Sequence, residues 1–149
     1  MQISSKLPQF NNERALIIVA GIYDAIFYLI NQGKINRISE FTFDKVKYEN
    51  EKDTYLKTGG TVSVRGGISY ENDYQKIAGQ EFVKNFKETI DKFFKDEEID
   101  SVYVFAPDKN INRIPELLSE NLKAKIKLKK EGNYLKKHPF EIIEIVKGL

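Results

Sequence analysis

The chain has 149 residues, which suits one domain, and its 41% hydrophobic and 31% charged residues indicate a globular protein with a buried core. A net charge of +2 does not by itself favour nucleic acid or an anionic membrane as a partner, and the lack of cysteine excludes disulfides, thiolate nucleophiles and cysteine-ligated metals. One histidine leaves no pair for a histidine-rich zinc site, and no run approaches the about 18 apolar residues of a membrane span. Residues 1–10 also lack the apolar run of about 7–15 residues that a signal peptide needs, so we expect a cytoplasmic protein without a cofactor.

The first half of the chain predicts three consecutive strands, preceded by an extension at residues 1–13. Residues 15–21 form a short apolar run that is typical of a buried central strand. Residues 22–30 are aromatic and β-prone, and turn residues follow them. Residues 35–44 alternate between apolar and polar side chains, with an irregularity around Ser39-Glu40 that indicates a β-bulge. Neighbouring strands usually pair, so we expect an antiparallel meander.

The second half predicts helices that alternate with strands. Apolar residues at a spacing of three to four predict an amphipathic helix over residues 74–95, with Asp73 as its N-cap. The other expected elements are strands at residues 99–106 and 124–130 and helices at residues 112–121 and 139–147. The order β-β-β, long loop, α-β-α-β-α predicts a single α/β domain with a mixed sheet covered by helices, antiparallel at first and parallel in its second half.

A long polar segment, residues 45–73, separates these halves. It is charged and punctuated by glycine, and stretches of this length without a helical or strand period are usually functional or disordered. Its TGGTVSVRGG sequence has paired glycines, which permit close approach of the backbone to a partner, but the spacing fits no nucleotide-binding fingerprint and we expect no strand-to-helix junction there. Contact with a phosphate backbone and a surface loop without a partner both stay open. The candidate contact residues are Lys57, Gly59, Gly60, Arg65, Gly66 and Gly67.

A basic cluster follows the second half of the expected sheet. Lysines occupy every second position from Lys123 to Lys129, so a strand here would carry them on one face. Residues 123–138 contain seven lysines and a single acidic residue. Such a stripe suits an RNA backbone, whereas lysines on an edge strand also protect a protein against aggregation, and both interpretations stay open. The candidate contacts are Lys125, Lys127 and Lys129.

The carboxylates do not predict a catalytic centre. Asp24 and Asp100 lie near strand starts, and Glu81 and Glu88 lie on the long helix, while the apolar strand centres carry no acid. A two-metal nuclease needs several acids that converge on one point, so we expect structural or solvated roles and no metal site. His138 precedes a helix start, where we expect a cap or a surface residue rather than a general base. No serine has a base partner for a triad, so the residues favour a protein that is not an enzyme.

The sequence ALIIVAGIYDAIFYLINQGKINRISEF resembles the opening of the bacterial host attachment protein family, described as proteins required for attachment to host cells. The similarity continues through YQKIAGQEFVKNFKETIDKFF and DSVYVFAPDKNINRI to KEGNYLKKHPFEIIEIV, and it covers roughly residues 14–148. The tail is its most specific part, with a short polar stretch after the last strand and then a helix that starts at proline.

Families of this kind are similar in turn to the middle domain of archaeal and eukaryotic class-1 release factors, which has a ribonuclease-H-like arrangement. In that domain the loop after the third strand carries Gly-Gly-Gln, which assists peptidyl-tRNA hydrolysis. Here the two glycine pairs are followed by Thr61 and Ile68, so neither has the glutamine. The resemblance therefore implies a release-factor-like fold and places release activity in doubt.

Three functions remain as alternatives. The first is a non-catalytic binding module that contacts RNA or the translation machinery through the glycine-rich loop and the lysine face, with the ribosome or tRNA as partner and neither DNA nor a membrane. The second is a hydrolase that acts on peptidyl-tRNA or RNA, with Mg²⁺ held by Asp24 and other acids. The third is an interaction protein in host-cell attachment, against which the lack of an export signal speaks. The residues do not indicate an oligomeric state.

Overall fold

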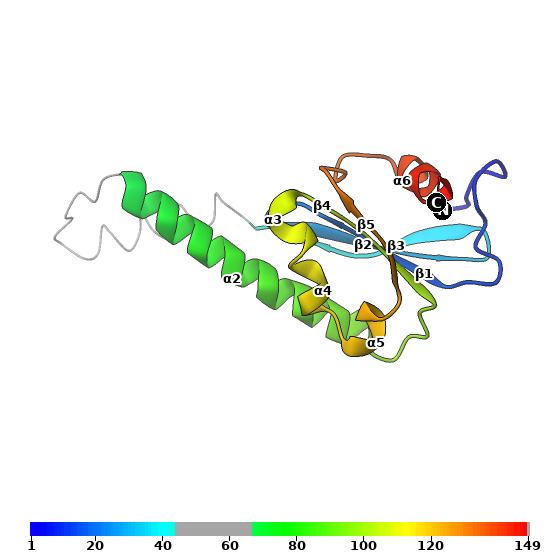
Figure 1. Ribbon diagram of the computed structural model, residues 1–149, viewed down its shortest axis with the longest axis horizontal. Helices are drawn as coiled ribbons and strands as arrows, with labels where there is room; N and C mark the ends of the chain where they lie inside the picture. The colour runs from blue at the N-terminus through cyan, green and yellow to red at the C-terminus, as the bar shows by residue number, and fades with distance from the viewer. Residues whose placement is uncertain (44–66, 149) are drawn as a thin grey trace.

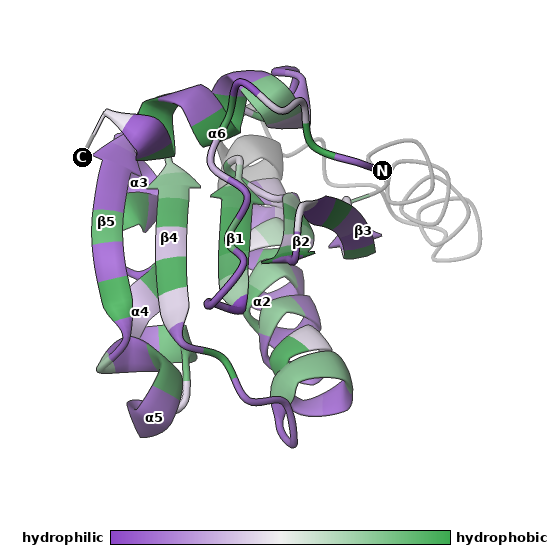
Figure 2. Cartoon of the chain, turned by 90° about the vertical axis from the view of Figure 1, so that its right-hand side faces the viewer, coloured by the Kyte–Doolittle hydropathy of each residue, from purple (hydrophilic) through white to green (hydrophobic). Residues whose placement is uncertain are grey.

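A computed structural model of the protein describes residues 1–43 and 67–148. Five strands of these residues form one mixed sheet in the order β3-β2-β1-β4-β5, with helices on both faces (Figures 1 and 2). The strands are β1 (Ala15–Ala20), β2 (Ala25–Asn31), β3 (Lys34–Phe41), β4 (Ser101–Ala106) and β5 (Ile126–Glu131). The helices are α2 (Gly67–Phe94), α3 (Asp108–Ile111), α4 (Ile114–Leu117), α5 (Glu120–Lys123) and α6 (Pro139–Lys147). The predicted mixed α/β fold is confirmed.

The predicted antiparallel meander is formed by β1, β2 and β3. The β2–β3 hairpin turns at Gln32 and Gly33, whose φ angles of 48° and 74° match the two-residue turns that fit the twist of paired strands. The predicted bulge lies one residue earlier than expected: Tyr28 pairs with Arg37 and Phe27 with Ser39, so the residue between Arg37 and Ser39 is the extra one. The predicted start of β2 is also too early, because residues 21–24 form the turn from β1.

The parallel half of the sheet consists of β1, β4 and β5. All residues of β1 and β4 are buried, as continuous apolar runs in central strands predict. The single helix expected over residues 112–121 is wrong, because three short helices occupy residues 108–123. Pro115 lacks the N–H that a continuous helix needs, Leu118 is extended, and the Ser119 hydroxyl then caps α5 by accepting a hydrogen bond from the Leu122 N–H.

Each face of the sheet carries its own core, since successive strand residues point to opposite faces. On one face, Phe82 and Phe86 of α2 pack on strand residues that include Leu16. On the other face, α6 and the N-terminal residues pack on strand residues that include Ile17 and Phe105. Figure 2 shows α2 behind the sheet and α6 in front of it.

The start of α2 differs most from prediction. The helix begins at Gly67 rather than Tyr74, so Asp73 lies inside it and is not its N-cap. Its 28 residues correspond to a length of about 42 Å at about 1.5 Å per residue. The side chains that it buries beyond residue 72 begin at Ala78, and its N-terminal part extends past the end of the sheet (Figure 1). That part has no sheet to pack against, so it carries no apolar period from which sequence could predict a helix.

Candidate functional site

The chain on either side of residues 44–66 meets at one end of the sheet. Phe43 follows β3, and Tyr74 lies in the projecting part of α2, yet their ring centroids are 5.4 Å apart. The ring of Tyr23, from the β1–β2 turn, lies 6.4 Å from Phe43 and 5.8 Å from Tyr74. The two contacts of Tyr74 have the edge-to-face geometry that aromatic pairs prefer. These three half-buried rings, which we call the loop-root cluster, join β3, α2 and the β1–β2 turn.

The β1–β2 turn at residues 21–24 is held from α3. The side-chain amide of Asn110, only 2% exposed, donates hydrogen bonds to the carbonyls of Gly21 at 2.6 Å and Ile22 at 3.0 Å. The Gly21 N–H donates to the Asp24 carbonyl at 2.8 Å, which closes the turn. A Cβ atom on Gly21 would meet the Asp24 carboxylate and the Leu135 side chain, so any larger residue here would have to displace both side chains.

The carboxylate of Asp24 is the ionisable group of this turn. Burial raises the pKa of Asp24 above its ordinary value, although hydrogen bonds from the backbone N–H groups of Asp24 and Tyr23 oppose the increase. Asp100 lies at the other end of the sheet, where its Oδ2 accepts a hydrogen bond from the Arg14 N–H at 2.8 Å. The two acids therefore do not converge. Within residues 1–43 and 67–148, no group of three acidic or histidine side chains is placed to hold a metal ion.

The glycine-rich candidates are divided by the boundary of the described chain. Lys57, Gly59, Gly60, Arg65 and Gly66 lie outside the described residues. Gly67 is the first residue of α2, so its assignment to the loop is corrected and the second glycine pair adjoins a helix start. The expectation that no strand-to-helix junction surrounds this sequence stays a prediction, because the residues before Gly67 lie outside the described part of the chain.

The lysine candidates do not share one face of β5. Ile126 pairs with Val102 and Leu128 with Tyr103, so Lys127 is an extra residue in a β-bulge. Lys127 is exposed and its Nζ lies 2.8 Å from Glu13 Oε1, beside the core that α6 covers. Lys129 lies on the opposite face, where its Nζ is 3.5 Å from Asn112 Oδ1.

The remaining lysines at this edge differ in their surroundings. Lys125 precedes β5 and is half-exposed. Lys123 belongs to α5, where its Nζ pairs with Glu116 Oε1 at 3.1 Å. The bulge and the change from helix to strand therefore separate lysines that appear as one alternating stripe in the sequence.

The contact between Lys127 and Glu13 shifts the pKa values of both residues. Burial, the largest single influence, raises the pKa of Glu13, but the interactions with Lys127, Ser101 and Tyr103 together outweigh it and leave that pKa below its ordinary value. The hydrogen bond to Glu13 raises the pKa of Lys127. The Tyr103 hydroxyl also contacts Glu13, at 3.5 Å. This pair therefore ties the N-terminal residues to β5.

His138 has the capping role that its position predicts. Its Nδ1 accepts a hydrogen bond from the Phe140 N–H at 3.1 Å, at the start of α6. Its ring also packs edge-to-face on Phe140, with centroids 4.9 Å apart.

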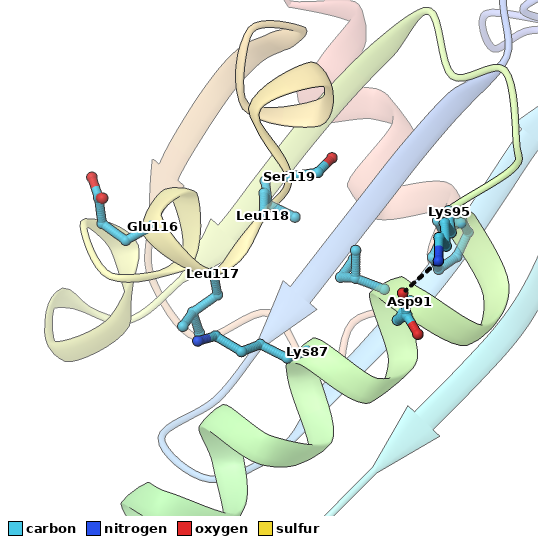
Figure 3. A pocket seen from close by; sticks show the side chains of 9 residues that line it. Lys87, Asp91, Lys95, Glu116, Leu117, Leu118 and Ser119 are labelled. Atoms are coloured by element: carbon cyan, nitrogen blue, oxygen red, sulfur yellow. Dashed lines mark ion pairs between the residues drawn. The ribbon is translucent and has the colours of Figure 1, made fainter.

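A cleft of about 400 Å³ lies between α2 and α4 (Figure 3). Ile90 and Phe94 of α2 and Leu117 of α4 line it together with charged residues, among which Asp91 and Lys95 form an ion pair at 3.8 Å. The cleft is on the packed part of α2, away from the loop-root cluster. Of the candidate contact residues in the described part of the chain, none lines it.

Asn110 and the loop-root cluster were missed by sequence reasoning. Asn110 sits in a polar stretch after β4, and its two partners are 88 and 89 residues away in the chain. No local sequence pattern predicts a contact between residues so far apart in the chain. Tyr23 and Phe43 were assigned to strands, and their position beside Tyr74 became evident only when the sheet was assembled.

Comparison with known proteins gives one informative similarity. No family model matches the chain, and no curated protein matches it. Among solved structures, the chain is similar to the archaeal translation termination factor aRF1, with a TM-score of 0.51 and 15% sequence identity. The similarity covers 92% of this chain and 39% of the release factor, so the chain spans well under half of that protein. At this identity the likeness shows the fold.

These comparisons test the two predicted resemblances differently. The predicted likeness to a release-factor domain is confirmed at the level of fold. Membership of the host attachment family stays a prediction. In the described part of the chain, the apolar stretches within helices are too short and too charged to span a bilayer. The chain thus has the fold of a release-factor domain.

Proposed function

We propose that this domain is a non-catalytic module that binds RNA of the translation machinery, with the ribosome or tRNA as partner. The observation that carries the proposal is the projection of α2 from a release-factor-like fold, with residues 44–66 joined to its N-terminal end. The similar solved structure is a translation termination factor, which supports a role in translation for this chain. The fold alone does not assign an activity, so the residues must carry the rest.

The contact chemistry comes from the segment that α2 carries. Lys57 and Arg65 lie close in sequence to its two glycine pairs. Cations neutralise phosphates, while glycine lets the backbone approach a partner closely. No glutamine follows either glycine pair, which supports binding rather than peptidyl-tRNA hydrolysis. The separation of Asp24 and Asp100 gives a metal-dependent nuclease no support.

The lysines of the β5 edge supply a second, weaker contact. Lys123 and Lys127 form ion pairs with glutamates, whereas Lys125 and Lys129 form no ion pair with the described residues. A lysine already paired with a carboxylate releases fewer counterions when it meets a phosphate, so it contributes less to binding. We therefore assign the edge contact to Lys125 and Lys129, and a smaller part to Lys127.

Sedimentation of the purified protein with ribosomes and with total tRNA, over a range of salt concentrations, tests the proposal. Lys57→Ala with Arg65→Ala should weaken binding by about tenfold or more and should reduce the salt slope by about one to two, as expected for two lost phosphate contacts. Lys84→Ala with Lys87→Ala removes two exposed cations from the packed part of α2 and is the matched control. The absence of any association at low salt would contradict the proposal.

A further inference from the structure

The strongest unexplained polar feature is the buried amide of Asn110. Its single NH₂ group satisfies two backbone carbonyls, of Gly21 and Ile22, within one turn. Loss of that donor would leave the buried Gly21 carbonyl and the part-buried Ile22 carbonyl without these partners, and the buried one makes this loss costlier than that of a surface hydrogen bond. The position of the turn relative to α3 therefore depends on this side chain.

The turn at residues 21–24 determines where Tyr23 lies. Tyr23 directly follows Ile22, and its ring contacts both Phe43 and Tyr74. Phe43 is the last described residue before residues 44–66, and Tyr74 lies in the early part of the helix that follows them. A path of direct contacts thus runs from α3 through the turn to both flanks of the segment.

The loop-root cluster is separate from the packing that holds the domain together. Its rings belong to neither hydrophobic core, whereas α2 is anchored by Ala78, Phe82 and further residues toward its C-terminus. Loss of the cluster should therefore affect local order at the start of α2 more than global stability.

We propose that Asn110 is a positioning residue for the RNA contact: through the turn at residues 21–24 it holds Tyr23 in place, and Tyr23 fixes both flanks of residues 44–66. Only the consequence for RNA rests on the proposed function. The coupling of Asn110 and Tyr23 to the start of α2 is independent of it and can be measured without RNA.

Amide hydrogen exchange on the full chain measures this coupling without RNA. In Asn110→Ala and in Tyr23→Ala, exchange at residues 73–77 should be faster by about tenfold, the scale of one or two lost interactions, while residues 82–94 change little. Asn110→Asp keeps the volume but points a carboxylate at two carbonyls, so its effect should be at least as large. The double variant Asn110→Ala with Tyr23→Ala should resemble Tyr23→Ala, because residues on one path are not additive.

Tyr134→Ala is the matched control. Its half-buried ring packs edge-to-face on Phe105, with centroids 5.3 Å apart, beside the other core. It removes an aromatic contact of similar kind and should leave residues 73–77 no more exposed to exchange than the rest of α2. If Asn110→Ala does not fold, Tyr23→Ala, whose ring lies outside both cores, tests the same coupling. Uniformly faster exchange in all amides, or faster exchange confined to residues 21–25, would overturn the inference.

Ribosome and tRNA sedimentation of the same variants separates the two proposals. Weaker association of Asn110→Ala and Tyr23→Ala, with unchanged association of Tyr134→Ala, is the expected result. If the wild-type protein does not associate, the proposed function fails while the measured coupling remains. If the wild type associates and Asn110→Ala associates equally despite altered exchange, the positioning role is wrong and the proposed function is kept.

Discussion

The two parts of α2 are held by different interactions. Between Ala78 and Phe94 the helix buries a stripe of large side chains against the sheet. Before Ala78 it extends past the sheet, and its described contacts there are the rings of the loop-root cluster, while Ile77 is 38% exposed. The packed part supplies stability, and the projecting part can therefore carry contacts with a partner without weakening the core. A helix is suited to this division because its backbone hydrogen bonds are internal.

The two ends of the sheet repeat this contrast. At the end near Glu13, side chains are joined by ion pairs: Arg14 with Glu97 at 2.6 Å and Lys127 with Glu13 at 2.8 Å. At the end near Asp24, the turn is held by an amide and by aromatic rings. The first end is thus held by paired charges, whereas the second end is ordered mainly by uncharged groups.

The largest expected effect separates the two parts of α2. Phe86 is fully buried, and its ring lies 5.3 Å from that of Phe27 and 5.8 Å from that of Phe82. Phe86→Ala should lower the free energy of unfolding by about 3–5 kcal/mol, through lost burial and a cavity. Ile77→Ala, on the projecting part of the same helix, should change it by less than about 0.5 kcal/mol. Urea denaturation measures both values, and equal losses would remove the distinction between the two parts.

A smaller effect of opposite sign is expected at the junction of the two parts. Gly79 lies inside α2, and a Cβ atom placed on it meets no other atom within 4 Å. Gly79→Ala should therefore stabilise the protein by about 0.5–1 kcal/mol, because alanine loses less backbone entropy in a helix. Thermal unfolding should show a higher midpoint. Destabilisation would mean that this glycine is required for a bend or a contact between the two parts.

Acid titration of stability tests the ion-paired end of the sheet. Glu13 has a pKa below its ordinary value in the folded protein, so its contribution is present above the unfolded value of 4.5 and is lost as the pH falls through the folded pKa. Glu13→Gln should remove that part of the acid sensitivity and cost less than about 1 kcal/mol at pH 7, because Lys127 is exposed. Denaturation curves at pH 7, 5 and 3 give the comparison. If the stability of the variant depends on pH as strongly as that of the wild type, the pair of Glu13 and Lys127 is not the source of the acid sensitivity.

The smallest effect is expected at Asp24, with the opposite dependence on pH. Its raised pKa means that folding favours the protonated acid, so its contribution is present at low pH and is lost as the pH rises through the folded pKa. Asp24→Asn should therefore be neutral at pH 3 and stabilising by less than about 0.5 kcal/mol at pH 7. The same denaturation series measures it. Destabilisation at pH 7 would show that the charged carboxylate is needed by the turn.

Much of the fold was predictable because burial leaves a local period. The apolar runs of β1 and β4, the stripe from Ala78 to Ile90, and the cap at His138 were all evident in the sequence and are confirmed. The last buried ring of that stripe is Phe94, where the spacing predicts Phe93. The candidate site was less predictable. The separation of Lys127 from Lys129 depends on a bulge that alternation does not reveal, since every second residue is still lysine.

By itself, the sequence determined the fold class, the meander, and the strands and helices whose apolar faces are buried. Tertiary structure alone decided where α2 begins, how residues 108–123 divide into short helices, and that Asn110 holds a turn 88–89 residues away. The physical reason is the range of the interactions. Burial of one face of a helix or strand requires apolar residues at a regular spacing, and the projecting part of α2 has no such face. A hydrogen bond between distant segments forms only after the sheet has brought them together.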